Sequence, residues 1–185
     1  LHFADLHEVD LRYIFLWSKW LRYEGAWKPD IKQKTYSFAR DIARECSTRC
    51  TEKQSVKSLR SASTVAAVVR LAQSDPRIAA IPDDFDSNPW LFNTPGGTVD
   101  LKTGELREHR REDYLTKTSG ITPKVADCPL WNSFLDRITN EDHELQRYLQ
   151  RFAGYSLTGL TSEHVLAFLY GTGANGKTTY TNTLL

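Results

Sequence analysis

The feature that most constrains this chain lies near its end, where an apolar run meets a glycine-rich turn. The run VLAFLY, residues 165–170, leads directly into GTGANGKT, residues 171–178. A buried strand, a glycine-rich loop and the start of a helix, in that order, are typical of a phosphate-binding P-loop. The pattern therefore predicts a strand at 165–170 and a helix that begins near Lys177.

Each residue type in this turn suits phosphate binding. Its glycines adopt backbone angles that side chains disfavour and let backbone N–H groups approach an anion. Lys177 is expected to reach the β- and γ-phosphates of ATP, and the Thr178 hydroxyl to ligate Mg²⁺, so these two are the predicted catalytic residues. The competing interpretation is a glycine-rich turn without a ligand. The predicted nucleotide-binding residues are Gly171, Gly173, Ala174, Asn175, Gly176, Lys177, Thr178 and Thr179.

A P-loop ATPase also uses an acidic residue on a second strand, and usually an arginine, to act on the nucleotide. This chain ends at Leu185, begins at Leu1 and contains no methionine. We therefore expect a segment of a longer protein, inactive by itself because its ATPase domain is incomplete. The strand at 165–170 would then lack neighbours, so we expect the last twenty or so residues to be weakly stabilised and to promote association.

Composition excludes several classes of protein. The 185 residues are 40% hydrophobic and 25% charged, as in ordinary globular proteins. No apolar run reaches the roughly 18 residues of a membrane span, so no membrane partner is expected. The three cysteines are too few for a disulfide framework, which favours a reducing, cytoplasmic location. Cys46 and Cys50 have helical spacing, but no second pair of ligands completes a metal site, so buried thiols are favoured.

The net charge of +1 conceals an uneven distribution. Residues 31–70 hold nine basic and three acidic residues, a balance of +6. Residues 71–100 hold one basic and five acidic residues, a balance of −4. The basic segment is compatible with nucleic-acid contact and equally with a solvated helix face.

The N-terminal part predicts a small aromatic β-meander. Strands are expected at about 11–15, 19–23 and 26–28, with a turn at Glu24-Gly25. We interpret its aromatic residues as core, in preference to a base-stacking platform with the adjacent basic residues. The residues concerned are Trp17, Trp20, Tyr23 and Trp27, with Arg12, Lys19 and Arg22 beside them.

Helical periodicity follows the meander. One helix is expected from the stripe Ile31, Phe38, Ile42, Cys46 and Cys50, and a second over Ser63–Ala72, ended by Asp75-Pro76. A loop over 81–89, with Phe85 and Trp90 as anchors, precedes a hairpin of strands 98–101 and 105–109. His109 is expected to be exposed and not catalytic.

Two more helices lead into the P-loop strand. The first is expected to start at Pro129 and to end at Asn140. The second is expected over 142–157, with acidic residues in its first turn, where the helix dipole favours them. Together with the earlier elements they predict an α+β chain: a small aromatic β-meander and hairpin with several helices, a helical linker, and the first strand–P-loop–helix of a truncated α/β ATPase domain.

Several stretches resemble one family. The chain carries KWLRYEGAWK, DFDSNPWLFNTPGGTVDLKTGELREHRREDYLTK, PLWNSFLDRITNEDHELQRYLQRFAGYSLTG and FLYGTGANGKTT in this order. Their order and spacing resemble the phage and plasmid primase-helicase family over nearly the whole chain. In that family a poxvirus-type NTPase N-terminal domain precedes a superfamily 3 helicase.

The resemblance implies an organisation and an activity. It implies an N-terminal domain at 1–128, a helical linker or collar at 129–163 and the start of a superfamily 3 ATPase domain at 164–185. It further implies an ATP-dependent DNA helicase that replicates a phage, prophage or plasmid as a homo-oligomer, expected to be a hexamer, on single-stranded or forked DNA. By the family's motif, Gly173, Asn175, Gly176, Lys177 and Thr178 form the nucleotide cradle.

Two other classes of function remain open. One is a P-loop kinase or small-molecule NTPase with an unrelated N-terminal extension, because P-loops serve many chemistries. The other is a non-catalytic DNA-binding or assembly module in which residues 1–128 act alone. Stimulation of ATP turnover by single-stranded DNA would separate the helicase from the kinase, and a steep salt dependence of DNA binding by residues 31–70 would favour the module.

Overall fold

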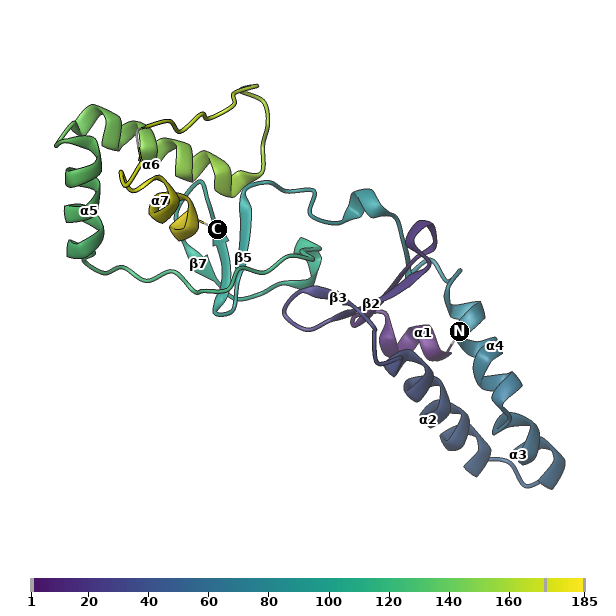
Figure 1. The fold of residues 1–185 in the computed structure, drawn as a ribbon. Coiled ribbons are helices and arrows are strands. Elements are labelled where there is room, and N and C mark those ends of the chain that lie inside the picture. The colour runs from purple at the N-terminus through teal and green to yellow at the C-terminus, as the bar shows by residue number, and fades with distance from the viewer. Residues whose placement is uncertain (1, 172, 185) are drawn as a thin grey trace.

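The computed structural model describes residues 2–171 and 173–184 and arranges them in two lobes (Figure 1). The N-terminal lobe, residues 2–80, contains helices α1–α4 and a four-stranded sheet. The C-terminal lobe, residues 91–184, contains a three-stranded sheet and helices α5–α7. Small sheets and several helices agree with the α+β class predicted for most of the chain.

The first three strands form the predicted meander. They are antiparallel neighbours, with Tyr13 of β1 opposite Trp20 of β2. A fourth strand pairs in parallel with β1 after the three helices that follow the meander, and its two residues carry too little pattern to be predicted. The strands are β1 (Leu11–Ile14), β2 (Lys19–Tyr23), β3 (Trp27–Pro29) and β4 (Ala79–Ala80), in the order β3-β2-β1-β4.

Helices α2 and α4 lie side by side and build the core of the N-terminal lobe (Figure 1). Buried Ala39 and Ala43 of α2 share one hydrophobic cluster with Val65 and Val69 of α4 and with Leu11 of β1. Removing these apolar side chains from water is the main stabilising contribution. The helices are α1 (His2–His7), α2 (Lys34–Thr48), α3 (Lys53–Leu59) and α4 (Ala62–Ala72).

The first predicted helix begins later than expected. Ile31, predicted as the first residue of its apolar stripe, precedes α2 and is 87% exposed. The Asp30 carboxylate instead accepts hydrogen bonds from the backbone N–H groups of Lys34 (2.9 Å) and Thr35 (2.8 Å) and from the Thr35 hydroxyl (2.7 Å). Because the first turn of a helix leaves such N–H groups unpaired, this carboxylate favours a start at Lys34.

The predicted hairpin is part of a larger sheet. β6 and β7 pair antiparallel around the expected turn, and a third strand, β5, pairs with the other side of β6. The sequence analysis does not predict β5, because its buried residues Asn93 and Thr94 are polar. The strands are β5 (Leu91–Thr94), β6 (Gly97–Asp100) and β7 (Leu106–Arg107), the last shorter than expected.

The segment that follows β7 ties the two lobes together through Trp27. The Trp27 indole donates a hydrogen bond to the Arg111 carbonyl (2.9 Å), and the Tyr114 ring stacks on it at 5.7 Å between centroids. Phe85 meets both rings edge-on. Trp27 is 1% exposed, so the interpretation of this residue as core is confirmed. Large buried rings of this kind contribute strongly to packing.

Helices α5 and α6 pack against each other at a steep angle, and α7 packs on both (Figure 1). Asn140 ends α5 in a left-handed conformation, and the Asp142 carboxylate caps α6 by accepting from the N–H groups of Glu144 and Leu145, both at 3.0 Å. Buried Tyr180 of α7 donates its hydroxyl to the Leu149 carbonyl of α6 (3.0 Å). Helices α5 (Pro129–Thr139) and α6 (His143–Thr158) match the prediction closely, and α7 (Lys177–Leu184) begins where expected.

The predicted strand at 165–170 is wrong. Residues 165–170 have no regular secondary structure, and their side chains are exposed, with Leu166 at 91% and Phe168 at 81%. A strand needs a neighbour for its backbone N–H and C=O groups, and no strand of residues 2–171 and 173–184 pairs with this segment. In the same described ranges, no helix is long and apolar enough to cross a membrane.

Candidate nucleotide-binding site

The glycine-rich loop before α7 follows a path that favours glycine. Gly173 and Gly176 have φ angles of +105° and +79°, and Ala174 between them has φ of +49°. Angles in this region are adopted readily by glycine and rarely by other residues. Gly171 also has a positive φ, of +155°. The predicted requirement for glycine at 173 and 176 is therefore confirmed; residue 172 lies outside the described residues.

The Lys177 side chain folds back over this loop. Its ammonium group donates hydrogen bonds to the Asn175 side-chain oxygen (2.6 Å) and to the Gly171 carbonyl (3.3 Å). Lys177 is also the first residue of α7, so the N-terminal end of that helix, where unpaired N–H groups and the positive end of the dipole lie, is next to the ammonium group. Positive charge is concentrated at this end of the loop.

A cavity of about 860 Å³ opens in front of the loop. Two of its lining side chains are cationic, Lys177 and Arg137, and none of its lining residues is acidic. A cavity of this size and charge fits an anionic ligand with several phosphates better than a cationic one. Its lining residues are Phe134, Arg137, Ile138, Gly173, Ala174, Asn175, Gly176, Lys177, Thr178 and Thr179.

Helix α5 lines this cavity together with the loop and packs on the loop. A Cβ atom built on Gly176 would lie 2.6 Å from Ile138 Cγ2 and 2.9 Å from Phe134 Cε2. Trp131, one turn earlier, stacks on Tyr180 of α7 at 6.0 Å between centroids. The helical pair α5–α6 therefore positions the loop. Phe134 and Ile138 are recognisable in the sequence as part of an apolar helix face, but their contact with the loop spans about 40 residues of chain and so leaves no local sequence signal.

The residues that line this cavity could hold Mg²⁺ only together with bound phosphate groups, which would supply further oxygen ligands. Thr178 and Thr179 supply hydroxyl oxygens to the cavity wall, but a carboxylate is missing from its lining residues. No group of three or more His, Cys, Asp or Glu in residues 2–171 and 173–184 is arranged to hold a metal ion. Mg²⁺ bound together with substrate phosphates needs few protein ligands, so this donor set suits a magnesium–nucleotide complex.

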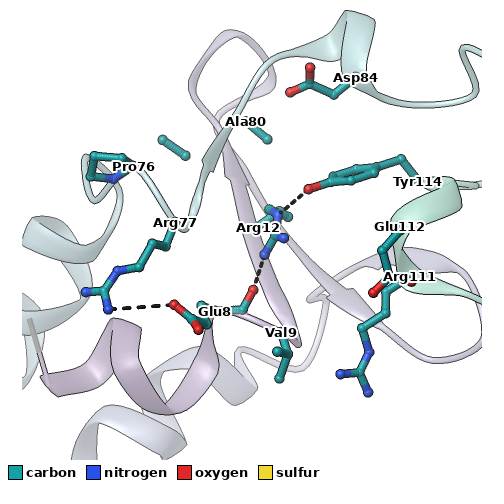
Figure 2. A pocket seen from close by; sticks show the side chains of 11 residues that line it. Glu8, Val9, Arg12, Pro76, Arg77, Ala80, Asp84, Arg111, Glu112 and Tyr114 are labelled. Carbon is teal, nitrogen blue, oxygen red and sulfur yellow. Dashed lines mark hydrogen bonds and ion pairs between the residues drawn. The ribbon is translucent and has the colours of Figure 1, made fainter.

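A second pocket, of about 400 Å³, lies beside β4 and contains Arg12 (Figure 2). The Arg12 guanidinium donates to the Tyr114 hydroxyl (3.0 Å) and to the carbonyls of Leu11 (2.7 Å) and Glu8. It also lies over the Trp27 ring at 5.0 Å. Arg12 therefore links β1 to the end of α1 and to the Tyr114 segment. Because its guanidinium already makes these contacts, Arg12 is a poor candidate for the predicted base-stacking platform. Trp20 and Tyr23 are half-buried, and Trp17 alone of the four predicted aromatic residues is exposed, at 42%.

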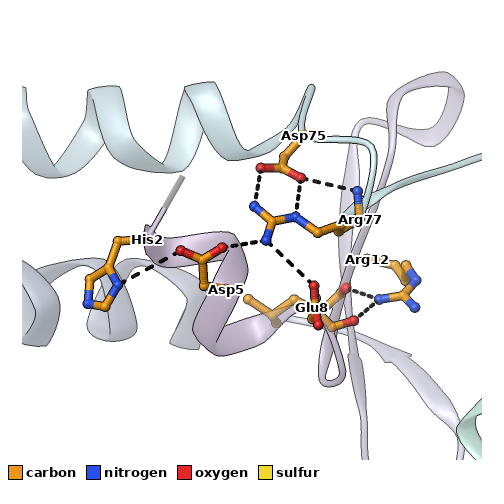
Figure 3. Close-up of polar contacts among 7 residues, drawn as sticks. His2, Asp5, Glu8, Arg12, Asp75 and Arg77 are labelled. Atoms are coloured by element: carbon orange, nitrogen blue, oxygen red, sulfur yellow. Dashed lines mark hydrogen bonds and ion pairs between the residues drawn. The ribbon is translucent and has the colours of Figure 1, made fainter.

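A polar cluster on the same lobe is centred on Arg77 (Figure 3). Its guanidinium pairs with Asp75 (2.9 Å), with Glu8 (3.6 Å) and with Asp5. Hydrogen bonds from Arg77 lower the pKa of Asp75 to about 2, from an ordinary 3.8, and they also lower the pKa of Asp5. Because Arg77 is shared among three carboxylates, from α1, from the turn after it and from the turn after α4, we interpret the cluster as a structural link between these elements.

The nine basic residues of segment 31–70 are all exposed. All except Lys32 lie on or at the ends of the helices α2–α4, which form one arm of the molecule (Figure 1). Arg44 and Arg49 pair with acidic residues of their own helix, Asp41 (3.3 Å) and Glu45 (2.6 Å). Arg60 donates to the Ser47 hydroxyl (2.7 Å) and so links α3 to α2. This exposure is compatible with both interpretations of the segment, nucleic-acid contact and solvated helix face.

Two other candidates differ from their predictions in detail. His109 is half-buried, not exposed, because its Nδ1 lies 2.9 Å from the Asn93 side-chain oxygen. Asn93 also donates to the Gly25 carbonyl (3.2 Å), so His109 takes part in a structural network between the lobes. Cys46 and Cys50 are half-buried free thiols, and the Cys50 thiol lies 3.6 Å from the Cys46 carbonyl.

Comparison with known proteins identifies the family. The family model described as "D5 N terminal like" matches residues 1–140, which is more than half of the chain. No curated protein matches the chain. The matched segment contains the whole N-terminal lobe, the three-stranded sheet and α5. The chain therefore belongs to the D5 N-terminal-like family, whose domain is found at the N-terminus of phage and plasmid primase-helicase proteins.

Proposed function

We propose that this chain is the N-terminal portion of an ATP-dependent replicative DNA helicase of a phage, prophage or plasmid. In this proposal the loop at 171–178 binds ATP with Mg²⁺, and hydrolysis drives DNA unwinding in the full-length protein, acting as a homo-oligomer in the cytoplasm. The observation that carries it is the cavity of about 860 Å³, lined by Lys177 and Arg137 without a carboxylate. Membership of a family found in primase-helicase proteins supports the DNA-directed role.

In this proposal each loop residue has a separate part. Backbone N–H groups at the start of α7 bind phosphate oxygens, because the first turn of a helix leaves them unpaired. Lys177 exchanges its hydrogen bonds to Asn175 and Gly171 for bonds to the outer phosphates. The Thr178 hydroxyl holds Mg²⁺ that the phosphates bring with them.

Lys177→Ala tests the proposal. Because the substitution removes the cation that faces the outer phosphates, we expect ATP–Mg²⁺ affinity to fall at least about tenfold, measured by titration calorimetry on the folded chain. Lys124→Ala is the matched control, since Lys124 is exposed and does not line the cavity. If the Lys177→Ala and parent chains bind ATP–Mg²⁺ with equal affinity, the proposal is wrong. The alternative of a non-catalytic module in which residues 1–128 act alone would then be favoured.

A further inference from the structure

We propose that Arg137 of α5 is a second phosphate-binding residue of this cavity and contacts the same polyphosphate as Lys177. The inference rests on the proposed nucleotide-binding function and adds a residue that lies 40 positions before Lys177 in the sequence. Two cations from two different elements of the cavity lining can contact more than one phosphate at a time. The ligand class is therefore a nucleoside di- or triphosphate in preference to a monophosphate.

The position of Arg137 is secured by its neighbours on α5. Phe134 and Ile138 contact the loop at Gly176, where a glycine Cβ would lie within 2.6 Å of Ile138 and 2.9 Å of Phe134. Residues three positions apart in a helix lie on the same face, so Arg137 lies on the face of α5 from which Phe134 contacts the loop. All three residues line the cavity together with Lys177. The contact at Gly176 thus holds the base of the Arg137 side chain beside the loop.

The Arg137 guanidinium is free to bind a ligand. Within residues 2–171 and 173–184, it forms no hydrogen bond and no ion pair, and its side chain is exposed. Two other arginines of the C-terminal lobe differ: Arg147 of α6 pairs with Glu144, and Arg107 of β7 pairs with Asp113 at 2.8 Å. An arginine that already holds a carboxylate would have to give up that contact to bind phosphate. Arg137 has no such contact to give up.

Arg137 also lies in the last turn of α5, where the helix dipole favours a cation. Stabilisation of the helix end would explain why position 137 is basic. It would not explain why the Arg137 side chain lines the cavity. The two roles make different predictions. The structural role affects the stability of the fold, whereas the phosphate-binding role affects ligand affinity.

The chemistry of the side chain suits the ligand. A guanidinium presents N–H groups in a planar fork that can donate two parallel hydrogen bonds to one phosphate, whereas an ammonium group acts as a compact charge. With Lys177 on the loop and Arg137 on α5, the polyphosphate would be held by cations from two separate elements. Thr178 and Thr179 remain available for Mg²⁺ and for further hydrogen bonds.

The test compares Arg137→Ala with Arg137→Lys and with a matched control, Arg151→Ala. Arg151 is an exposed arginine of α6 that does not line the cavity. Affinities for ATP, ADP and AMP, each with Mg²⁺, are measured by titration calorimetry, and the thermal midpoint of each variant is recorded. We expect Arg137→Ala to weaken ATP binding about tenfold, Arg137→Lys to weaken it less, and Arg151→Ala to leave it unchanged.

The outcomes separate this inference from the proposed function. An Arg137→Ala affinity equal to that of the parent chain, while Lys177→Ala abolishes binding, would overturn the role of Arg137 alone. If Arg137→Ala lowers the thermal midpoint but leaves ATP affinity unchanged, Arg137 only stabilises the end of α5, and its phosphate-binding role is overturned. An equal loss of AMP affinity would overturn the assignment to the polyphosphate. If Lys177→Ala also binds ATP normally, the proposed function itself fails.

Discussion

Arg77 holds carboxylates from two distant parts of the sequence. Asp5 and Glu8 belong to α1 and the turn that follows it, and Asp75 follows α4. The depressed pKa of Asp75 means that the folded state binds its proton less readily than the unfolded state does. A carboxyl group of this kind stabilises the fold above its unfolded pKa and loses that contribution as the pH falls through its folded pKa.

Arg77→Gln is therefore expected to destabilise the chain in a pH-dependent manner. The loss in free energy of unfolding should be full above about pH 4, should decrease between pH 4 and 2, and should vanish only below pH 2, because Asp75 is protonated in both states only below its folded pKa of about 2. Denaturant titrations from pH 2 to 7 measure it. Arg49→Gln is the control, since it removes an exposed pair within α2 and should change the free energy by at most about 0.5 kcal/mol. A difference between Arg77→Gln and parent that is constant from pH 2 to 5 would contradict the assignment.

At the scale of elements, helix α5 packs on the glycine-rich loop before α7 at Gly176. Two features favour glycine at position 176. Its φ is +79°, and a Cβ atom there would collide with Phe134 and Ile138. Gly97 and Gly171 of the same lobe also combine a positive φ with a close neighbour, whereas Gly154 has neither constraint. Gly154 lies inside α6, and a Cβ there would meet no atom within 4 Å. Gly176 and Gly154 therefore form a matched pair.

Gly176→Ala is expected to destabilise the loop and Gly154→Ala to stabilise the fold. Alanine at a positive φ costs about 1 kcal/mol or more, and the crowding against α5 adds to this. Alanine in a helix interior is favoured over glycine by about 0.5–1 kcal/mol. Urea unfolding and ATP titration of both variants measure the effects. A Gly176→Ala variant as stable as the parent would show that α5 does not pack on the loop as the structure has it.

At the scale of the whole molecule, the lobes differ in how their surfaces are covered. The N-terminal lobe has an apolar core between helices and sheet, although Phe15, Leu16 and Ile31 are exposed on its loops and its short 3-10 turn. In the C-terminal lobe, Val165, Leu166, Phe168 and Tyr170 are exposed along a segment without backbone pairing. Exposed apolar patches of this kind favour association.

Two measurements test this difference. Chymotrypsin should cleave within 165–170 before it cleaves at the buried aromatic residues of the N-terminal lobe, because segments without backbone pairing open readily. The paired variant Leu166→Asp/Phe168→Asp should reduce self-association in sedimentation velocity, while Ile31→Asp, which alters an exposed residue of the other lobe, should not. Resistance of 165–170 to chymotrypsin would contradict the expectation of a weakly stabilised tail.

The sequence by itself determined the features that depend on neighbouring residues. The meander, the ends of α5 and α6 and the start of α7 were predictable, because alternation, caps such as Asp142 and helix-ending residues such as Asn140 act within a few positions. The glycine requirement at 173 and 176 was predictable for the same reason, since it arises from local backbone angles.

Only the tertiary structure decided what depends on partners far along the chain. In the structure, α5 packs on the loop and Arg137 lines the same cavity. The strand β5, with its buried polar residues, pairs with β6, and residues 165–170 form no strand. An apolar run is compatible with a strand, but the strand forms only where another pairs with its backbone groups. A cation at the end of a helix is likewise ordinary in sequence, and its place in a cavity wall follows from packing between α5 and the loop.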